Sequence, residues 1–436
     1  MTRSTWRRIR VADLVASGDA EVKTGPFGTQ LHASDYVESG TPVINVRNIG
    51  FGSIRPDKLE YIADETVRRL SGHVLHPGDI VFGRKGAVER HVLIRDRQSK
   101  WFQGSDCLRL RLKTQRVLPQ FLSYYLLTRD HQTWMMQQCS HGATMASLNQ
   151  DIVGRIEFSA PDPAGQLAIA SILSAYDDLI ENNTRRIAIL EEMARRTYEE
   201  WFVRFRFPGH EGIQMVESEL GLMPKGWQIG TVADVAVVYR GRSYKGSELA
   251  DSGGRPFVNL KCMERDGGFR ASGLKRYTGQ FKESHTVRPG DMVMGITDMT
   301  QERRIVARVG RVSGLDADFG VFSMDLVRLA SRGVYGEPYL YAMFRWSSFA
   351  DEVKQHANGA NVLHLLPARI EEFAFARPTP ELAAQFADLL TPMLSLCDTL
   401  ERKNANLAAT RDLLLPKLIS GELDVSAMPE PEAVAA

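Results

Sequence analysis

The sequence lacks the signatures of several large protein classes. It has only four cysteines in 436 residues and no CxxC pair. Sparse, well-separated cysteines predict buried thiols in a reducing cytoplasm rather than disulfides or a zinc site. No apolar run approaches the length of a membrane span, and the first ten residues, MTRSTWRRIR, lack the apolar segment of a signal peptide. We therefore expect a cytoplasmic protein that does not contact a membrane.

Motifs for common catalytic chemistry are also missing. The sequence contains no GxxxxGK[ST], no GxGxxG after a strand, no HExxH and no G-x-S-x-G. The ten histidines are scattered without the spacing of metal ligands, which favours turn or surface positions. The pairs Asp177–Asp178 and Glu191–Glu192 fall in a predicted helix, where solvated flanks or intermolecular salt bridges are simpler than acid–base catalysis. We expect a non-catalytic chain with no metal site and no cofactor of its own.

The composition is that of a globular protein with two or more domains. Hydrophobic residues make up 43% of the chain and charged residues 25%. The net charge of +1 hides an asymmetry, because residues 1–160 contain 22 Lys and Arg against 16 Asp and Glu. An excess of this size fits either a solvated surface or a patch that faces phosphates.

Two segments, 163–202 and 386–418, carry a heptad pattern. Their seam residues recur in alternating steps of four and three, with Glu, Arg and Asn on the flanks. So narrow a stripe is typical of a helix that pairs with another helix. At about 1.5 Å per residue, about 40 residues span about 60 Å, which is long for a core helix. The first seam comprises Ile169, Leu173, Tyr176, Ile180, Asn183, Ile187, Leu190, Ala194, Thr197 and Trp201, and the second comprises Phe386, Leu390, Met393, Cys397, Leu400, Asn404, Leu407, Arg411, Leu414 and Leu418.

A flush antiparallel pairing of these seams places Asn183 opposite Asn404. Each amide would then satisfy the other and fix the register. The alternative is that either asparagine is merely solvated at an imperfect seam. Two prolines bear on the second helix: Pro392 is expected to kink it and Pro416 to end its regular part, because proline lacks the amide hydrogen.

The chain is an internal duplication. Four segments recur in the same order, with loops of different length between them. The pairs are WRRIRVADLVASG (6–18) with WQIGTVADVAVVYRG (227–241), GTPVINVRNIGFGSIR (40–55) with GRPFVNLKCMERDGGFR (254–270), HPGDIVFG with RPGDMVMG, and HGATMASL (from His141) with NGANVLHL (from Asn358).

Each repeat predicts the same local structures. Short β-branched runs bounded by Gly and Pro, such as 42–46 and 79–82, predict strands. A helical patch follows at 119–138 in the first repeat and at 337–356 in the second. The Gly- and Pro-containing segment 207–214 predicts a linker, and we expect the tail 426–436 to be disordered.

Loops beside glycines carry Arg, Lys, Asn, Gln and Thr at corresponding places in the two repeats. Such side chains can read guanine and adenine edges, but for any single residue a phosphate contact or a plain surface position is favoured over base readout. The set is more informative than any one member. The candidates for DNA binding are Thr29, Gln30, Arg47, Asn48, Arg84, Lys85 and Arg90 in the first repeat, and Asn259, Lys261, Gln301, Arg303 and Arg304 in the second.

Over essentially its full length, the chain resembles the specificity (S) subunit of type I restriction-modification enzymes. The segments that carry the resemblance are TPVINVRNI, HPGDIVFGRKG, LNQDIVGRIEFSAP, LMPKGWQIGTVADV and RDLLLPKLISGELDV. The resemblance implies an α+β protein with two repeated globular α/β target recognition domains, separated by an antiparallel coiled coil of two long helices. The implied segments are recognition domains at 1–160 and 208–378, spacer helices at 161–207 and 379–425, and the tail at 426–436.

The resemblance also implies partners. Such subunits bind double-stranded DNA at a two-part asymmetric site and recruit two adenine-methylating M subunits, joined in the restriction complex by two R subunits. S-adenosylmethionine, and ATP with Mg²⁺, would then be used by these partners rather than by this chain. The runner-up interpretation is a coiled-coil adaptor that binds other proteins without DNA specificity.

The second repeat departs from the family pattern after its PGD turn. The first repeat continues as Gly-Arg-Lys-Gly (83–86), close to the family's Ser or Thr, Arg, any residue, Gly, whereas the second continues as Gly-Ile-Thr-Asp (295–298). Because the arginine is missing there, we place no DNA-contacting role on Thr297 or Asp298. The expectation shifts to Gln301, Arg303 and Arg304.

Overall fold

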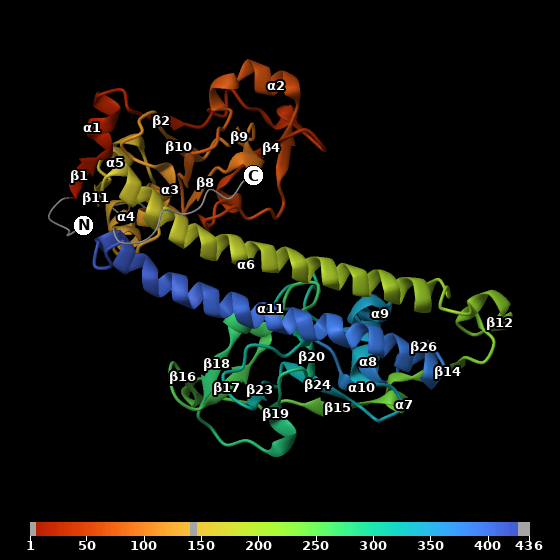
Figure 1. The fold of residues 1–436 in the computed structure, drawn as a ribbon. Coiled ribbons are helices and arrows are strands. Elements are labelled where there is room, and N and C mark those ends of the chain that lie inside the picture. The colour runs from red at the N-terminus through yellow and green to blue at the C-terminus, as the bar shows by residue number, and fades with distance from the viewer. Residues whose placement is uncertain (1–5, 140–145, 426–436) are drawn as a thin grey trace. The chain divides into compact units, whose positions relative to one another are not determined.

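A computed structural model describes residues 6–139 and 146–425 (Figure 1). The chain divides into two compact units, one formed by Met1–Ile180 and Asn406–Ala436 and the other by Glu181–Ala405. The two long helices, α6 (Pro163–Tyr198) and α11 (Pro380–Ser420), each contribute one part to each unit. The predicted domain boundaries set the helices apart from the globular domains, whereas the compact units divide both helices near their middle.

The first unit holds a mixed globular domain, here called the first domain. A five-stranded sheet has the order β2-β10-β7-β8-β5, a four-stranded sheet has the order β3-β6-β4-β9, and β1 pairs with β11. Its strands are β1 (Arg7–Arg10), β2 (Ala20–Thr24), β3 (Tyr36–Val37), β4 (Thr41–Ile44), β5 (Phe51–Gly52), β6 (Glu60–Ile62), β7 (Ile80–Gly83), β8 (His91–Leu93), β9 (Phe102–Gln103), β10 (Cys107–Leu112) and β11 (Glu157–Ala160). Its helices are α1 (Val11–Ala16), α2 (Asp64–Arg69), α3 (Pro119–Leu126), α4 (Arg129–Cys139) and α5 (Gln150–Gly154).

The second unit holds the second domain, which repeats this topology. One sheet has the order β15-β24-β20-β22, another β16-β18-β17-β23-β19, and β14 pairs with β26. Its strands are β12 (Met215–Ser218), β13 (Gly221–Pro224), β14 (Gln228–Thr231), β15 (Ala236–Arg240), β16 (Leu249–Ala250), β17 (Arg255–Val258), β18 (Lys275–Tyr277), β19 (Thr286–Val287), β20 (Met292–Gly295), β21 (Thr297–Asp298), β22 (Val309–Arg311), β23 (Gly320–Phe322), β24 (Leu326–Ser331), β25 (Leu363–His364) and β26 (Ala374–Arg377). Its helices are α7 (Val232–Val235), α8 (Glu337–Trp346), α9 (Phe349–Val353) and α10 (Pro367–Glu371).

The duplication seen in the sequence is therefore a duplication of fold. In each domain the strand that follows the PGD turn, β7 or β20, lies between two antiparallel neighbours and is fully buried. The opening strand, β1 or β14, pairs antiparallel with the strand just before the long helix, β11 or β26. The fold class is the predicted one, with two repeated mixed α/β domains and two long helices.

Each predicted helical patch is two helices rather than one. The first patch breaks between α3 and α4, where the Thr128 hydroxyl donates to the Tyr125 carbonyl at 2.7 Å. The second breaks between α8 and α9, where the Ser347 hydroxyl donates to the Met343 carbonyl and accepts from Phe349 N. Hydroxyl groups that bond local backbone compete with helix continuation, which accounts for both breaks.

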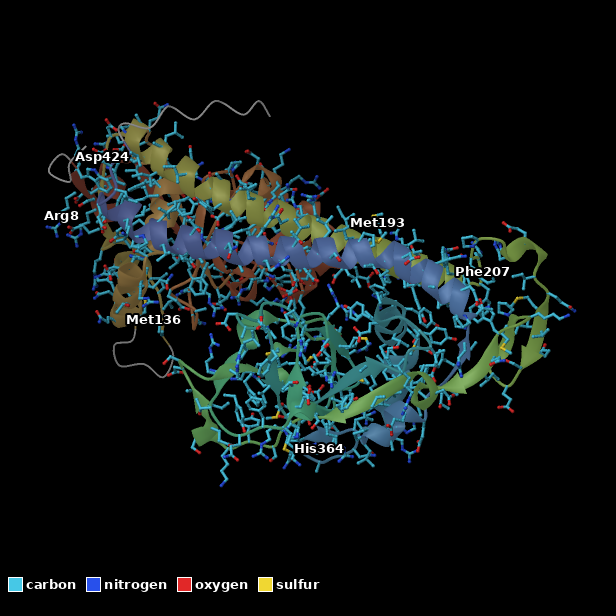
Figure 2. All side chains as sticks on the ribbon, turned by 60° about the horizontal axis from the view of Figure 1, so that its bottom comes forward. Arg8, Met136, Met193, Phe207, His364 and Asp424 are labelled. Atoms are coloured by element: carbon cyan, nitrogen blue, oxygen red, sulfur yellow. The ribbon has the colours of Figure 1, made fainter. Side chains whose placement is uncertain are left out.

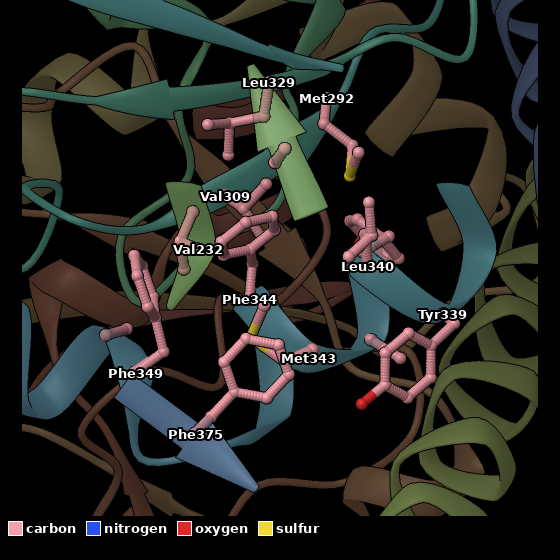
Figure 3. Packing of buried hydrophobic residues seen from close by; sticks show 14 of the residues in the cluster. Val232, Met292, Val309, Leu329, Tyr339, Leu340, Met343, Phe344, Phe349 and Phe375 are labelled. Carbon is pink, nitrogen blue, oxygen red and sulfur yellow. The ribbon is translucent and has the colours of Figure 1, made fainter. Parts of the chain in front are cut away.

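The second domain packs its core against the long helices (Figure 3). Side chains of α8 and α9, including Leu340, Phe344 and Phe349, interleave with residues of the sheet strands. The same buried cluster contains Trp201 and Phe386, whose rings lie 5.8 Å apart in edge-to-face contact. The seam between the helices thus continues directly into the domain core.

Helices α6 and α11 run antiparallel, and every residue of both predicted seams is buried or half-buried. Within the second unit, Asn183 Nδ2 donates to Asn404 Oδ1 at 2.9 Å, and Asn404 Nδ2 donates to Thr184 Oγ1 at 3.3 Å. Asn183 is only 7% exposed. The two asparagines are therefore in hydrogen-bond contact at the register that the heptad count predicts.

Helix α11 continues through both of its prolines. The prediction that Pro416 ends the regular helix is wrong, because α11 extends to Ser420. Both Pro392 and Pro416 lie on the exposed side of the helix. Water can satisfy the carbonyl that each proline leaves unpaired there, so the helix continues past them.

The acidic pair Asp177–Asp178 anchors the first domain to its helices and is not simply solvated. Asp177 accepts from Tyr124 Oη of α3 at 2.7 Å and from Arg411 Nη1 of α11 at 2.6 Å. Asp178 accepts from Arg95 Nη1 at 2.6 Å. The pattern of charges on a helix flank does not distinguish such intramolecular partners from solvent.

All four cysteines are free and buried, as their spacing predicts. Burial raises the pKa of the Cys139, Cys262 and Cys397 thiols to about 11. Among the described residues, no helix is both long and apolar enough to cross a membrane. The described part of the chain also contains no group of three or more His, Cys, Asp or Glu side chains placed to hold a metal ion.

Candidate nucleic-acid interface

Three loops of the first domain meet at one turn, residues 104–107, which we call the first hub. Gly25 N, directly after β2, donates to a hub carbonyl at 2.8 Å, and Arg84 N, directly after β7, donates to another at 2.9 Å. A hub amide in turn donates to the carbonyl of Ile44, the last residue of β4, at 2.9 Å. The loops that begin after these three strands therefore start from one place.

Two glycines make this convergence possible. A Cβ atom on Gly25 would lie 2.0 Å from the Gly104 carbonyl oxygen. A Cβ atom on Gly104 would lie 2.2 Å from Asn45 Oδ1. These distances are far inside van der Waals contact, so only glycine allows the strand ends to approach so closely.

The second domain builds an equivalent turn at residues 322–325, the second hub. Arg242 N, after β15, donates to a hub carbonyl at 2.8 Å, and Ile296 N, after β20, donates to another at 2.9 Å. A hub amide donates to the carbonyl of Val258, the last residue of β17, at 2.9 Å. The repeat therefore duplicates the convergence of loops as well as the sheets.

Arg47 and Lys261 occupy equivalent exposed positions. Each is the middle residue of a 3₁₀ turn, Val46–Asn48 or Leu260–Cys262, directly after β4 or β17. Arg47 forms an ion pair with Glu60 at 2.7 Å, whereas Lys261 has no ion-pair partner among the described residues. Both cations project from a turn that follows a strand ending at a hub.

Asn48 and Asn259 are corrections to the predicted set, because their side chains face inward. Asn48 is 0% exposed, and its Nδ2 donates to two backbone carbonyls at 3.0 Å each. Asn259 is 7% exposed, and its Nδ2 donates to two carbonyls while its Oδ1 accepts from Lys261 N at 2.9 Å. Both amides are used up in holding the turns that present Arg47 and Lys261, so neither is available to DNA.

The loop after β7 carries three of the predicted cations. Lys85 lies 3.4 Å from the hub carboxylate of Asp106. The Arg90 guanidinium sits over the Phe51 ring, 5.4 Å from its centroid. Arg84 is half-buried at the hub and has no ion-pair partner among the described residues. Of the three cations, Arg84 is therefore the one whose charge has no partner among the described residues.

Thr29 and Gln30 lie in the exposed loop that leaves the first hub after β2. The loop is ordered by its own turn, in which Phe27 N donates to Gln30 Oε1 at 3.4 Å and Gln30 N donates to the Phe27 carbonyl at 2.7 Å. Phe27 itself is 62% exposed. This solvent-facing aromatic side chain was not among the predicted residues, and only its position beside glycines could have indicated it.

The predicted side chains of the second domain make internal contacts. Gln301 Nε2 donates to the Ala360 carbonyl at 3.1 Å, and Arg303 Nη1 donates to Gln355 Oε1 at 2.8 Å. Arg304 forms an ion pair with Asp266, and this hydrogen bond lowers the pKa of the Asp266 carboxyl. The loop after β20 is therefore held in place by polar contacts that an anion would have to compete with.

Residues 146–148 of the first domain and β25 of the second, which belong to the repeated segments HGATMASL and NGANVLHL, contact these loops. In the first domain, Leu148 N donates to the Arg84 carbonyl at 2.8 Å, and Gly86 N donates to the Ala146 carbonyl at 3.0 Å. In the second, β21 pairs with β25, on which Figure 2 labels His364. Thr297 and Asp298 are buried in that pairing. The start of the first segment, residues 141–145, lies outside the described residues.

Comparison with known proteins agrees with this geometry. Residues 33–192 match the family described as "Type I restriction modification DNA specificity domain". The type I restriction enzyme MjaIX specificity subunit of Methanocaldococcus jannaschii is 24% identical over 374 residues, which cover 84% of this chain and 82% of that protein. The type I restriction enzyme HindI specificity subunit of Haemophilus influenzae is 21% identical over 437 residues, covering 87% and 94%.

The fold is also found in a solved structure. The S subunit of a type I restriction-modification system from M. genitalium superimposes with a TM-score of 0.59 at 14% identity, covering 95% of this chain and 96% of that one. At so low an identity the likeness concerns the fold. Together with the matched family, it confirms the resemblance that the repeated motifs indicate.

Proposed function

We propose that this chain, which resembles type I specificity subunits, is the DNA-recognition subunit of a type I restriction-modification enzyme. The observation that carries the proposal is the pair of hubs, each of which gathers three loops at the end of a sheet. Those loops hold the exposed cations Arg47, Lys85 and Lys261 and the half-buried Arg84. Fixed loops with cationic and amide side chains can hold phosphates and read base edges.

The two domains would read different half-sites. The hubs are equivalent, but the side chains around them differ: Arg47 corresponds to Lys261, and the loop 83–86 has no counterpart arginine at 295–298. Arginine binds a guanine edge through two parallel donors, whereas lysine presents a point charge, so the two are not interchangeable readers. The complete target is then bipartite and not a palindrome.

The outer face of the coiled coil offers a place for the methyltransferase. In the heptad abcdefg, with a and d in the seam, the domains pack against e positions such as Asp177 and Tyr198. Four g positions carry exposed apolar side chains, and Arg186, Glu200, Lys403, Thr410 and Lys417 occupy others. Met193 (Figure 2), Leu389 and Leu396 of the second unit are 48%, 47% and 37% exposed, and Leu179 of the first is 50% exposed.

Apolar side chains in such a row suit the docking of a partner helix. We assign this row to two M subunits, joined in the restriction complex by two R subunits. The chain itself would contribute no catalytic group. S-adenosylmethionine, and ATP with Mg²⁺, would be used by the partners, and the complex would act in the cytoplasm.

The test is to co-express the chain with the M subunit of its own system and map methylated adenines in the host genome. Methylation at one bipartite motif, dependent on both chains, is the expected result. Replacing residues 1–160 with those of a related subunit should change one half of the motif and leave the other. If M alone methylates the same motif, or if no motif is methylated by a complex that does assemble, the chain is an adaptor and the proposal fails.

A further inference from the structure

Each seam contains a single asparagine, and the two occupy different heptad positions. Seam positions of α6 alternate between d, beginning with Ile169, and a, beginning with Leu173, which makes Asn183 a d residue. Seam positions of α11 begin with d at Phe386, which makes Asn404 an a residue. The hydrogen bond of 2.9 Å between the two amides is thus a contact between d and a.

This placement is asymmetric within a symmetric coiled coil. The duplication relates seam residues of α6 and α11 by 217 positions, as for Ile169 and Phe386. The equivalent of the asparagine layer is then the layer of Ile187 and Leu400, which is apolar. One of the two central layers is polar and its counterpart is not, so the duplication did not copy the asparagine pair.

Antiparallel helices pack a residues against d residues. In an antiparallel pair of two α6 helices from different copies, Asn183 must therefore face an a residue, and α6 has no asparagine there. An antiparallel pair of two α11 helices places Asn404 opposite a d residue, and α11 has no asparagine at a d position. In a pair of α6 helices, the a residues that could face Asn183 are Leu173, Ile180, Ile187, Ala194 and Trp201. In a pair of α11 helices, the d residues that could face Asn404 are Phe386, Met393, Leu400, Leu407 and Leu414.

Slipped registers of the correct pair fail for the same reason. A shift by one heptad places Asn183 opposite Cys397 or Arg411 instead of Asn404. A parallel, in-register pair of two α6 helices would bring Asn183 to its own copy. That arrangement, however, stacks Ala194 on Ala194 and leaves a gap where the antiparallel seam places Met393 opposite Ala194.

We infer that the Asn183–Asn404 pair makes the seam of α6 selective for the seam of α11 in one register, and makes pairing of either helix with the same helix of a second copy unfavourable. A buried amide without a partner is costly, whereas the same amide paired costs little. In every antiparallel pairing of like helices each buried asparagine faces an apolar side chain, and a slip by one heptad separates the two asparagines of the correct pair. A duplicated chain needs such a device, because its two seams are otherwise similar enough to pair with themselves.

The experiment moves one asparagine from one helix to the other in the full-length chain. Ile187→Asn with Asn404→Leu gives α6 an asparagine at both d and a, so two copies of α6 can satisfy each other and the intramolecular seam cannot. Light scattering after refolding at a series of protein concentrations gives the dimer association constant. For this variant it should be larger than for the unsubstituted chain by at least about tenfold. A matched control, Asn183→Ile with Ile187→Asn, Leu400→Asn and Asn404→Leu, moves the pair to the other central layer and should behave like the unsubstituted chain.

A second measurement reports the pairing within one chain. In the native register Leu190 faces Cys397, so Leu190→Cys should give an intramolecular disulfide on oxidation. The yield of that disulfide should be complete in the control background and lower when both asparagines lie on α6. The fully apolar variant, Asn183→Ile with Asn404→Leu, should fold stably but lose selectivity. If it and the α6 variant both remain monomeric and form the disulfide as completely as the control, the asparagines do not select the partner.

Discussion

Tyr124 Oη donates a hydrogen bond of 2.7 Å to Asp177 Oδ2, and this contact joins helix α3 of the first domain to helix α6. Arg411 of α11 binds the other oxygen of the same carboxylate. One half-buried carboxylate therefore connects the globular domain to both long helices of its unit. Burial raises the pKa of the Tyr124 hydroxyl, so it remains a hydrogen-bond donor throughout the physiological pH range.

Tyr124→Phe should destabilise the first unit. The substitution leaves the ring and removes one hydrogen bond to a charged acceptor, which contributes about 1.5–3 kcal/mol. Urea unfolding followed by a probe in the first domain should show the loss. Tyr61→Phe is the matched control, because no side-chain hydrogen bond involves Tyr61 among the described residues; equal midpoints for the two variants would contradict the anchoring role.

Arg47 and Asn48 are adjacent, but alanine substitution of Arg47 should affect DNA binding and that of Asn48 should affect stability. Arg47→Ala removes an exposed cation and should weaken DNA binding at least about fivefold without lowering thermal stability. Asn48→Ala strands two buried carbonyls and should lower the free energy of unfolding by about 2 kcal/mol. Melting temperature and methylation of the first half-site, measured on both variants, separate the two roles. A stable Asn48→Ala protein with altered specificity would reverse our correction.

Arg84→Ala should weaken methylation of the cognate motif and leave the fold intact. The Arg84 amide is bonded at the first hub, and its side chain has no ion-pair partner among the described residues, so loss of the guanidinium costs little stability. We expect a decrease of at least about fivefold that diminishes as salt is raised. Arg116→Ala serves as the control, because Arg116 pairs with Asp19 at the opposite end of strands β2 and β10. Equal methylation by both variants would remove Arg84 from the interface.

The first domain should lose stability in mild acid. Burial lowers the pKa of His91 to about 3 and that of His131 to about 4, against about 6.5 for an unfolded histidine. Both are neutral when folded, so below pH 6.5 the unfolded state binds more protons. Stability is then complete above about pH 6.5 and falls as the pH decreases toward 4, by up to about 1.4 kcal/mol per pH unit for each histidine.

A series of urea titrations between pH 7 and pH 4.5 measures this slope. His131→Phe keeps an aromatic ring beside Tyr125 and Trp134 but removes one titrating group. For this variant, the decrease in the free energy of unfolding per pH unit should be smaller by the contribution of about one proton. An unchanged slope would show that other groups cause the acid sensitivity.

Met193→Glu combined with Leu396→Glu should prevent assembly with the M subunit. Both side chains are exposed at g positions of the second unit, so the charges should not disturb the isolated chain. Loss of co-purification with M, with unchanged circular dichroism, is expected. Leu220→Glu, which changes an equally exposed residue beside the β12–β13 hairpin, should assemble normally. Assembly of the double variant at the same yield would place the docking surface elsewhere.

The sequence was most informative where a pattern repeats. The heptad count placed Asn183 opposite Asn404, because a coiled-coil register depends only on spacing along two helices. The duplication likewise predicted two domains of one topology. Both inferences concern regularities that tertiary contacts rarely override.

Single side chains were predicted less well. Asn48 lies beside an exposed arginine in a glycine-rich loop, and nothing local shows that its amide turns inward to two carbonyls. Arg304 is held by Asp266, 38 residues earlier, across a contact that only the folded loops create. The hubs themselves are made of backbone hydrogen bonds, which constrain residue type only where strand ends approach closely, as at Gly25 and Gly104 of the first hub and Gly241 beside the second.

Because the hubs are built from backbone hydrogen bonds, the contacts that anchor the loops differ from the side chains that would recognise a target. The loops start at the hubs through main-chain hydrogen bonds, so exposed side chains such as Arg47 and Lys261 can change without loosening that attachment. A new target sequence would then need only point substitutions in the loops, with no compensating change in the sheets. If each domain reads one half of a bipartite target as proposed, two independent hubs would allow each half to evolve while the other stays fixed.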